Sequence, residues 1–245
     1  MVTFGPGLAG LVDGGRLAVR EAAREAVSSG FRPLDDLLPA GGVRRGSLLE
    51  WLAGAGEDAT GTGAASLACA VACRLARAAP GRAGTIVVVD RPGWFHPPAV
   101  LPWLGGPDGA RLVVARPAHD ADEIWTIDQA LRCAGVTAVL AWPRPAATTG
   151  RRRSTQSWTV AMRRWQLAAR SSGAVGLFVR PASARGEPSW AEARIAVSPS
   201  PGGTLLERRL RLVRVGGAWT GTEDGAERAV EVVLDLARGG AGAMR

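Results

Sequence analysis

The chain has 245 residues, of which 47% are hydrophobic and only 21% charged, so it can bury one large core and is not expected to be disordered. No apolar run approaches the ~18 residues of a membrane-spanning helix, and the first residues lack the pattern of a secretory signal. Three cysteines, an odd number, do not make a disulfide framework. We therefore expect a cytoplasmic protein without membrane contact.

Arginine supplies all 30 basic residues, and the chain contains no lysine. This excludes Schiff-base chemistry and the lysine that grips phosphates in a P-loop. The two histidines, His96 and His119, leave little material for a catalytic triad or a metal site. The net charge of +8 is concentrated, because residues 151–214 hold 13 arginines against 3 acidic residues. This segment favours a polyanionic partner, nucleic acid first; the alternative is an ordinary solvated face.

The N-terminal third predicts helices around one strand and a glycine-rich loop. Apolar residues at helical spacing indicate a helix, weakened by two glycines, and a shorter helical turn follows it. A buried strand then leads through the loop into an alanine-rich helix. The expected elements are a helix at 7–28, a turn within 31–46, a strand at 47–53, the loop at 54–63 and a helix at 64–79.

The remaining elements alternate before the pattern changes. Apolar runs predict strands at 85–90, 112–116, 138–142 and 175–180, and helical spacing predicts helices at 97–104, 119–134 and 158–172. Such alternation indicates an α/β fold with a mostly parallel twisted sheet flanked by helices. After residue 190 a period of two predicts strands at 194–197, 208–215 and 230–236, as a C-terminal antiparallel extension. We therefore divide the chain into a helical segment at 1–30, a core domain at 31–236 and a flexible tail at 237–245.

The glycine-rich loop stands where a phosphate-binding loop belongs but lacks its chemistry. The vestigial positions are Gly54, Gly56, Gly61, Thr62 and Gly63, with Thr62-Gly63 in place of the usual lysine and hydroxyl residue. The strand at 138–142 ends in a tryptophan where an acid would hold magnesium, and Asp90 is followed by Arg-Pro rather than by a catalytic glutamate. We predict no catalytic residue, no metal site and no cofactor.

The run LDDLLPAGGVRRGSLLEWLAG at 34–54 resembles the lead-in to the first strand and P-loop of the RecA family. Four later segments, TIVVVDRPGWFHPPA, DEIWTIDQALRCAGVTAVLAW, RRWQLAARSSGAVGLFVRP and SWAEARIAV, follow in the order seen in ImuA-type translesion-synthesis accessory proteins. This resemblance covers residues 31–215 and implies a RecA-like core. It also implies a non-catalytic, nucleoid-associated role in an SOS-induced mutasome. The implied partners are an ImuB-like inactive Y-family polymerase homologue, an error-prone C-family DNA polymerase and RecA.

The same resemblance places the loops after the fourth and fifth strands, about 143–157 and 182–189, along the DNA axis. The candidate contacts there are arginines, which neutralise phosphates regardless of base sequence. DNA and an acidic protein surface both remain open as their target. For Trp158 we favour packing in the core beside Trp165 over stacking on an exposed base. The candidate contacts are Arg151, Arg152 and Arg153 in the first loop, Arg163 and Arg164 at the start of the helix that follows it, and Arg185 in the second loop.

Smaller signals indicate structure rather than chemistry. Cys69 and Cys73, four residues apart on an apolar helix, are expected to be buried, and Cys133 is expected to be packed as well. His119, with Asp120 and Asp122, is expected to mark a helix N-terminus that capping and the helix dipole stabilise.

Two further functions compete with the accessory role. One is a divergent DNA-dependent ATPase in which Arg44 or Arg45, just before the loop, replaces the lysine, although arginine is not equivalent to lysine. The other is a regulator that binds RecA and limits recombination. Copurification of RecA would indicate this regulator, whereas copurification of a polymerase assembly would indicate the accessory role.

Overall fold

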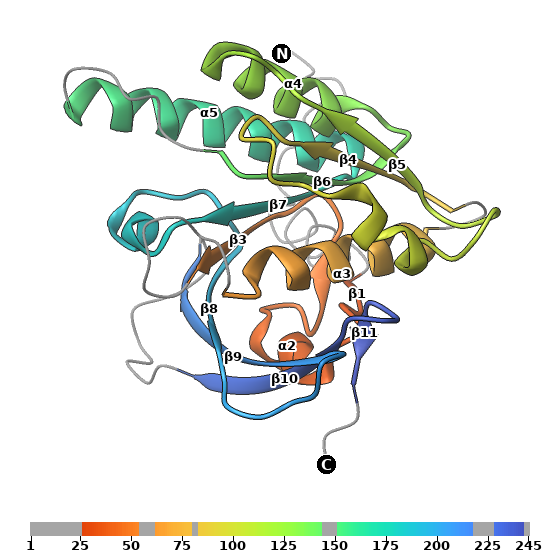
Figure 1. Cartoon of the computed structure of the whole chain (residues 1–245). Coiled ribbons are helices and arrows are strands. Elements are labelled where there is room, and N and C mark those ends of the chain that lie inside the picture. The colour runs from red at the N-terminus through yellow and green to blue at the C-terminus, as the bar shows by residue number, and fades with distance from the viewer. Residues whose placement is uncertain (1–25, 54–61, 80–82, 144–150, 218–227, 243–245) are drawn as a thin grey trace, which may run out of the picture.

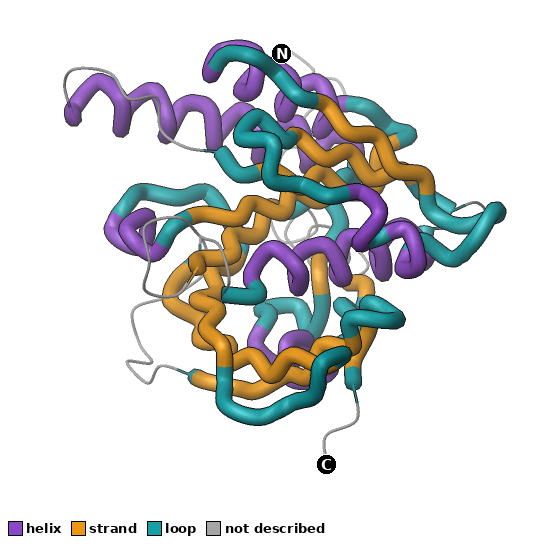
Figure 2. Tube along the Cα trace, in the orientation of Figure 1, coloured by secondary structure: helices purple, strands orange, loops and turns teal. Residues whose placement is uncertain are grey.

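The computed structural model describes residues 26–53, 62–79, 83–143, 151–217 and 228–242, with the backbone alone at 151–157. Figure 1 shows these residues as a sheet with helices on both faces. Figure 2 shows how strands dominate the centre of the molecule and its C-terminal part. The predicted α/β class, with a mostly parallel sheet and an antiparallel C-terminal part, is confirmed.

The large sheet has nine strands in the order β11-β10-β9-β8-β3-β7-β6-β4-β5. Six of these strands pair with one another in parallel. They are Leu48–Ala53 (β3), Thr85–Val89 (β4), Arg111–Ala115 (β5), Val136–Ala141 (β6), Val175–Arg180 (β7) and Ala193–Pro199 (β8). Antiparallel pairing adds Glu207–Gly216 (β9), Ala229–Asp235 (β10) and Gly240–Ala241 (β11).

The helices cover both faces of this sheet. They are Arg32–Leu37 (α2), Ala64–Arg77 (α3), Asp120–Arg132 (α4) and Arg151–Ser172 (α5), with 3₁₀ turns at Pro97–Ala99 (η1), Leu101–Trp103 (η2) and Ala182–Gly186 (η3). In Figure 1, α4 and α5 lie on one face and α3 on the other, while β8, β9 and β10 curl around α2. A separate small sheet pairs Ala26–Val27 (β1) with Val43–Arg44 (β2).

Two apolar cores hold these layers together. One lies between the sheet and α3 and includes Trp51 and Leu67; the other lies under α4 and α5 and includes Trp165 and Phe178. Trp158 is buried, with its ring 5.5 Å from that of Trp165 in an edge-to-face arrangement, so the favoured core position is confirmed. The central strands β3, β6 and β7 are buried along their whole length, which is why they read as continuous apolar runs.

Several predicted elements differ in the structure. Ala26–Val27 form strand β1 rather than the end of a helix, and the rest of the helix expected at 7–28 lies outside the described residues. Strand β8, expected to be antiparallel, runs parallel to β3, so the antiparallel part begins at β9. Within the segment expected as a tail, Gly240–Ala241 pair with β10. Period-two patterns give no strand direction, and a two-residue strand leaves no pattern at all.

Candidate functional site

Three segments begin at the carboxyl ends of the parallel strands: the predicted glycine loop, the turn after β4 and the loop after β7. In open α/β sheets ligands bind at this edge. Gly54, Gly56 and Gly61 lie outside the described residues. Gly63, at the N-terminus of α3, has φ +85°, and a Cβ there would overlap the side chain of Leu210 on β9. The hydroxyl of Thr62 accepts a hydrogen bond from the N–H of Ala64 at 3.3 Å, so both residues have a structural role.

Asp90, at the end of β4, is fully buried and organises the turn that follows. One carboxylate oxygen accepts from the backbone N–H of Trp94 at 2.9 Å, and the other accepts from Phe95 at 3.1 Å and from Nε of Arg116 at 3.3 Å. Trp142, at the position where an acid would hold magnesium, packs with its ring 6.3 Å from that of Phe95. Neither position therefore offers a free carboxylate to a metal ion.

The arginines that could have replaced the lysine lie at the other edge of the sheet. Nη2 of Arg45 donates to the carbonyl of Ala78 at 3.2 Å, directly after the C-terminus of α3. Nε of Arg44 lies 3.4 Å from Glu192. The glycine loop joins the opposite end of α3, about 20 Å away along a helix of this length.

A buried ion-pair network fixes the loop after β7. The carboxylate of Glu50, on β3, accepts from Nη1 of Arg180 at 3.1 Å and from Nε of Arg194 at 2.6 Å, and all three residues are buried. Arg180 also pairs with Glu187 at 2.6 Å, and its guanidinium lies 4.1 Å from the ring centre of Trp158. Buried Glu50 and partly exposed Glu187 thus balance the two buried arginines.

Arg194 also holds the backbone of this loop. Its guanidinium donates to the carbonyls of Arg185 at 3.0 Å and Glu187 at 3.2 Å, and a third bond goes to Ala184. Sequence reasoning missed the network of Glu50, Arg180 and Arg194. A glutamate inside the apolar run SLLEWLA was the signal that could have revealed it, because an acid in a buried strand needs a partner.

The structure places the candidate arginines along α5 and the η3 loop. Arg151, Arg152 and Arg153 begin α5 rather than standing in a loop, and their side chains lie outside the described part. In Figure 1 this end of α5 projects past the carboxyl ends of the strands. Arg163 lies 4.4 Å over the ring of Trp190, which brings α5 and the chain after η3 together. Arg185 is exposed on η3.

Arg164 lies in a different setting, at the seam between α4 and α5. Its Nη2 is 3.3 Å from the carboxylate of Asp128, which Arg132 also binds at 2.8 Å. On the same two helices three apolar side chains face solvent: Trp125 on α4 is 61% exposed, and Val160 and Leu167 on α5 are 56% and 49% exposed. Spacings of three and four residues put each set on one side of its helix. We call Trp125, Val160, Arg164 and Leu167 the seam patch.

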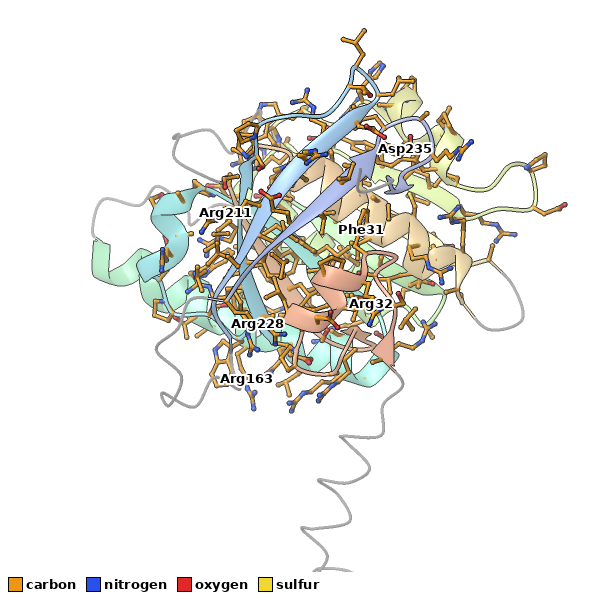
Figure 3. All side chains as sticks on the ribbon, turned by 90° about the horizontal axis from the view of Figure 1, so that it is seen from below. Phe31, Arg32, Arg163, Arg211, Arg228 and Asp235 are labelled. Carbon is orange, nitrogen blue, oxygen red and sulfur yellow. The ribbon has the colours of Figure 1, made fainter. Side chains whose placement is uncertain are left out.

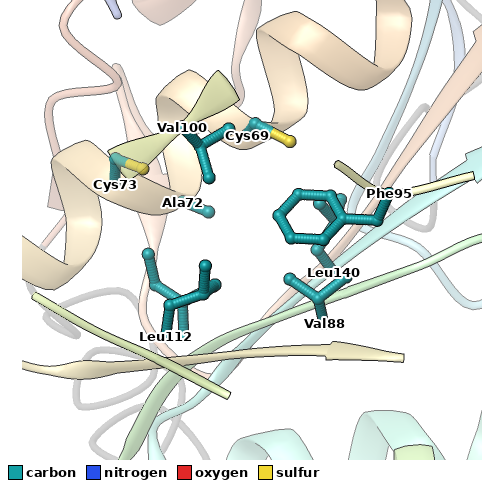
Figure 4. A pocket seen from close by; sticks show the side chains of 9 residues that line it. Cys69, Ala72, Cys73, Val88, Phe95, Val100, Leu112 and Leu140 are labelled. Carbon is teal, nitrogen blue, oxygen red and sulfur yellow. The ribbon is translucent and has the colours of Figure 1, made fainter. Parts of the chain in front are cut away.

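The cysteines differ from one another. Cys69 and Cys73 are buried as predicted and line a small apolar cavity of about 10 Å³ with Phe95 and Val100 (Figure 4). Burial raises the pKa of both thiols, that of Cys73 to about 11. The cavity has room for about one water molecule. Cys133, predicted to be packed, is exposed, because α4 ends at Arg132.

His119 stands at the N-cap of α4 but its side chain makes no capping hydrogen bond, so the predicted cap is wrong. The helix N-terminus expected here is confirmed, and Asp120 and Asp122 lie in its first turn, where they complement the helix dipole as expected. Within the described ranges, no three histidine, cysteine or acidic side chains lie close enough to hold a metal ion. No helix in that part of the chain is long and apolar enough to cross a membrane.

The geometry defines an α/β protein with a basic helix beside the carboxyl edge of its sheet and a mixed aromatic and arginine patch on its outer face. Comparison with models of known protein families gives no match for this chain, and comparison with curated protein sequences gives none either.

Proposed function

We propose that this chain is a non-catalytic, RecA-like accessory protein of a translesion DNA synthesis complex. It contacts partner proteins and single-stranded DNA. Support for the RecA-like assignment comes from the strand β3 and helix α3, which flank the glycine loop at the middle of a mostly parallel sheet. Support for a non-catalytic role comes from the structural roles of Thr62, Asp90 and Trp142.

The observation that carries the proposal is the seam patch. Exposed tryptophan and arginine beside aliphatic side chains form the usual centre of a protein interface. Arg164 is one of the arginines for which the sequence left either DNA or a protein as the partner. Its ion pair with Asp128 and its apolar neighbours favour a protein partner.

The basic N-terminus of α5 supports the contact with single-stranded DNA. The helix carries six arginines and no acidic residue, and the first three begin it. Proteins that bind single strands use such positive segments to follow the phosphate backbone. The partners we propose are the ImuB-like polymerase homologue, the error-prone C-family polymerase and RecA.

Affinity purification of the tagged protein from cells with damaged DNA tests the proposal. We expect the two polymerase-type partners to copurify with the wild type and to be lost with Trp125→Ala combined with Leu167→Ala. Both side chains are largely exposed, so the double variant retains the fold, which circular dichroism checks. Val113→Ala, at an exposed apolar position on β5, is the matched control.

Three results would count against this function. Equal recovery of the polymerases with the double variant would remove the seam patch from the interface. Recovery of RecA alone would favour the regulator that limits recombination. Recovery of none of these partners with the wild type would contradict the accessory role itself.

A further inference from the structure

One side edge of the nine-stranded sheet is open. Within the described residues, strand β5 pairs only with β4 and ends the order of strands (Figure 1). It contains no proline and no bulge, and Arg111 is its one charged residue. The opposite edge is blunted, because β11 spans two residues, and Figure 3 shows Arg211 and Asp235 on the two strands next to it. Proteins usually protect apolar strand edges from pairing, so β5 is available to a further strand.

The backbone groups of Leu112 and Val114 point away from the sheet. The N–H of Arg111 donates to the carbonyl of Gly84 at 3.0 Å, and the carbonyl of Ala115 accepts from the residue after β4 at 2.8 Å. Both ends of β5 therefore direct their backbone groups toward β4. Because these groups alternate in direction along a strand, those of Leu112 and Val114 face the open edge. In the described part of the chain no strand pairs with them there.

Both faces of β5 are apolar at its centre. Leu112 and Val114 are half-buried against the core under α3. Val113 points to the other face, because its neighbour in the register of β4, Val87, belongs to the core under α4 and α5. Helix α4 packs on β4 and β6, and Val113 remains 49% exposed beside it. A further strand at this edge would thus find apolar side chains to pack against on either face.

We propose that β5 pairs with β5 of a second copy of this chain, antiparallel and centred on Val113, in a closed dimer with two-fold symmetry. The outward backbone groups favour this register, because Leu112 of each copy lies opposite Val114 of the other and each such pair exchanges both of its N–H to carbonyl bonds. The two Val113 side chains then meet at the symmetry axis, in a pair without backbone bonds, where side chains approach most closely. A shift by one residue would bring apolar side chains to opposite faces.

Charge complementarity also favours a second copy as the partner. In this register Arg111, at the amino end of β5, lies opposite Ala115, at the carboxyl end of the partner strand. The second copy continues from there into its α4, whose first turn carries Asp120, Asp122 and Glu123, and Asp122 is exposed. Arg111 is exposed and points to the face of the sheet that α4 covers, so each copy brings this arginine toward the acidic turn of the other. The dimer does not depend on the function proposed above.

Sedimentation velocity of the full chain over a series of concentrations tests the dimer. We expect the wild type to dimerise reversibly as its concentration rises. Val113→Lys and Val113→Glu each place two like charges opposite one another at the axis, so each is expected to weaken dimerisation about tenfold or more. Two controls should dimerise nearly as the wild type does. Val113→Ala keeps the backbone groups of β5 and adds no charge, and Leu205→Lys adds the same charge at a fully exposed position between β8 and β9.

A mixture of the two charged variants tests the register. Val113→Lys and Val113→Glu together are expected to form a mixed dimer, because opposite charges then face each other at the axis. Circular dichroism checks that both fold. If either does not, Val113→Cys with Cys133→Ser replaces the pair, and diamide, which takes up the two electrons and two protons of the thiols, should link its copies through a disulfide, since opposite residues lie close enough for one.

Four results would overturn the proposal. The first is a wild type that stays monomeric at every concentration, and the second is assembly beyond two copies, which indicates a head-to-tail contact instead of a closed one. The third is dimerisation of Val113→Lys equal to that of Leu205→Lys. The fourth is failure of the folded charged variants to pair when mixed, or failure of the Val113→Cys variant to cross-link.

Discussion

Glu50 shows how one side chain links the centre of the sheet to a surface loop. It is the one acid in β3, and it binds Arg180 and Arg194 within 3.1 Å. Arg194 in turn holds three carbonyls of the loop that carries Arg185. The position of the exposed arginine therefore depends on a carboxylate that solvent does not reach.

Replacing Glu50 by glutamine is expected to lower the free energy of unfolding by about 3 kcal/mol or more, because the buried guanidinium of Arg194 loses its counter-charge and Arg180 keeps only Glu187. Urea unfolding measures this loss, and hydrogen exchange should show faster exchange in η3. Arg208→Gln, an exposed charge on β9, serves as the control and should change stability by less than about 0.5 kcal/mol. If Glu50→Gln were as stable as this control, the network would not hold the loop.

The three thiols should react at very different rates. Cys133 is exposed, whereas Cys69 and Cys73 are buried and have raised pKa values, so little of their reactive thiolate is present at neutral pH. We expect one thiol to react quickly with a chromogenic disulfide reagent in the folded protein and all three in denaturant. Cys133→Ser should abolish the fast phase. A fast phase of two or three thiols would show that α3 opens readily.

At the scale of elements, α5 departs most from the sequence prediction. Its apolar spacing begins at Trp158, but the helix begins at Arg151, and the residues before Trp158, RRRSTQS, are all polar and so carry no apolar spacing. Three arginines at a helix N-terminus oppose the helix dipole. This placement lowers helix stability, so the packing of the helix does not explain why three arginines stand there.

Replacing Arg151, Arg152 and Arg153 together by alanine is expected to weaken binding of single-stranded DNA and to flatten its salt dependence. If all three contact phosphates, the slope of log K against log salt falls by about 2. A titration series in salt, followed by fluorescence anisotropy, gives both quantities. The control removes three exposed arginines elsewhere, at Arg208, Arg211 and Arg238. Unchanged affinity across the series would assign the helix end to a protein partner instead.

At the scale of the whole molecule, the sequence predicted the alternation of strands and helices but not how strands pair. A continuous apolar run such as TIVVV in β4 predicts a buried strand, and this prediction needs only the residues of the run itself. The order of nine strands depends on contacts between distant residues, such as Glu50 with Arg194, which no spacing rule connects. For the same reason the arginines were found as candidates, whereas their partners Trp190, Asp128 and Glu192 were not.

The chain is expected not to hydrolyse ATP. We expect phosphate release from ATP to equal that of a blank without protein, with or without single-stranded DNA. The sequence has no lysine, Thr62 caps a turn, Trp142 replaces an acid, and Arg44 and Arg45 point to the edge away from the glycine loop. Phosphoryl transfer needs positioned cations at the phosphates, and none of these residues supplies one. A coupled phosphate assay with magnesium measures the rate. Any magnesium-dependent turnover would contradict the non-catalytic role. Its loss in Arg44→Gln or Arg45→Gln would favour the divergent ATPase, and its survival in both would direct attention to the loop at 54–61.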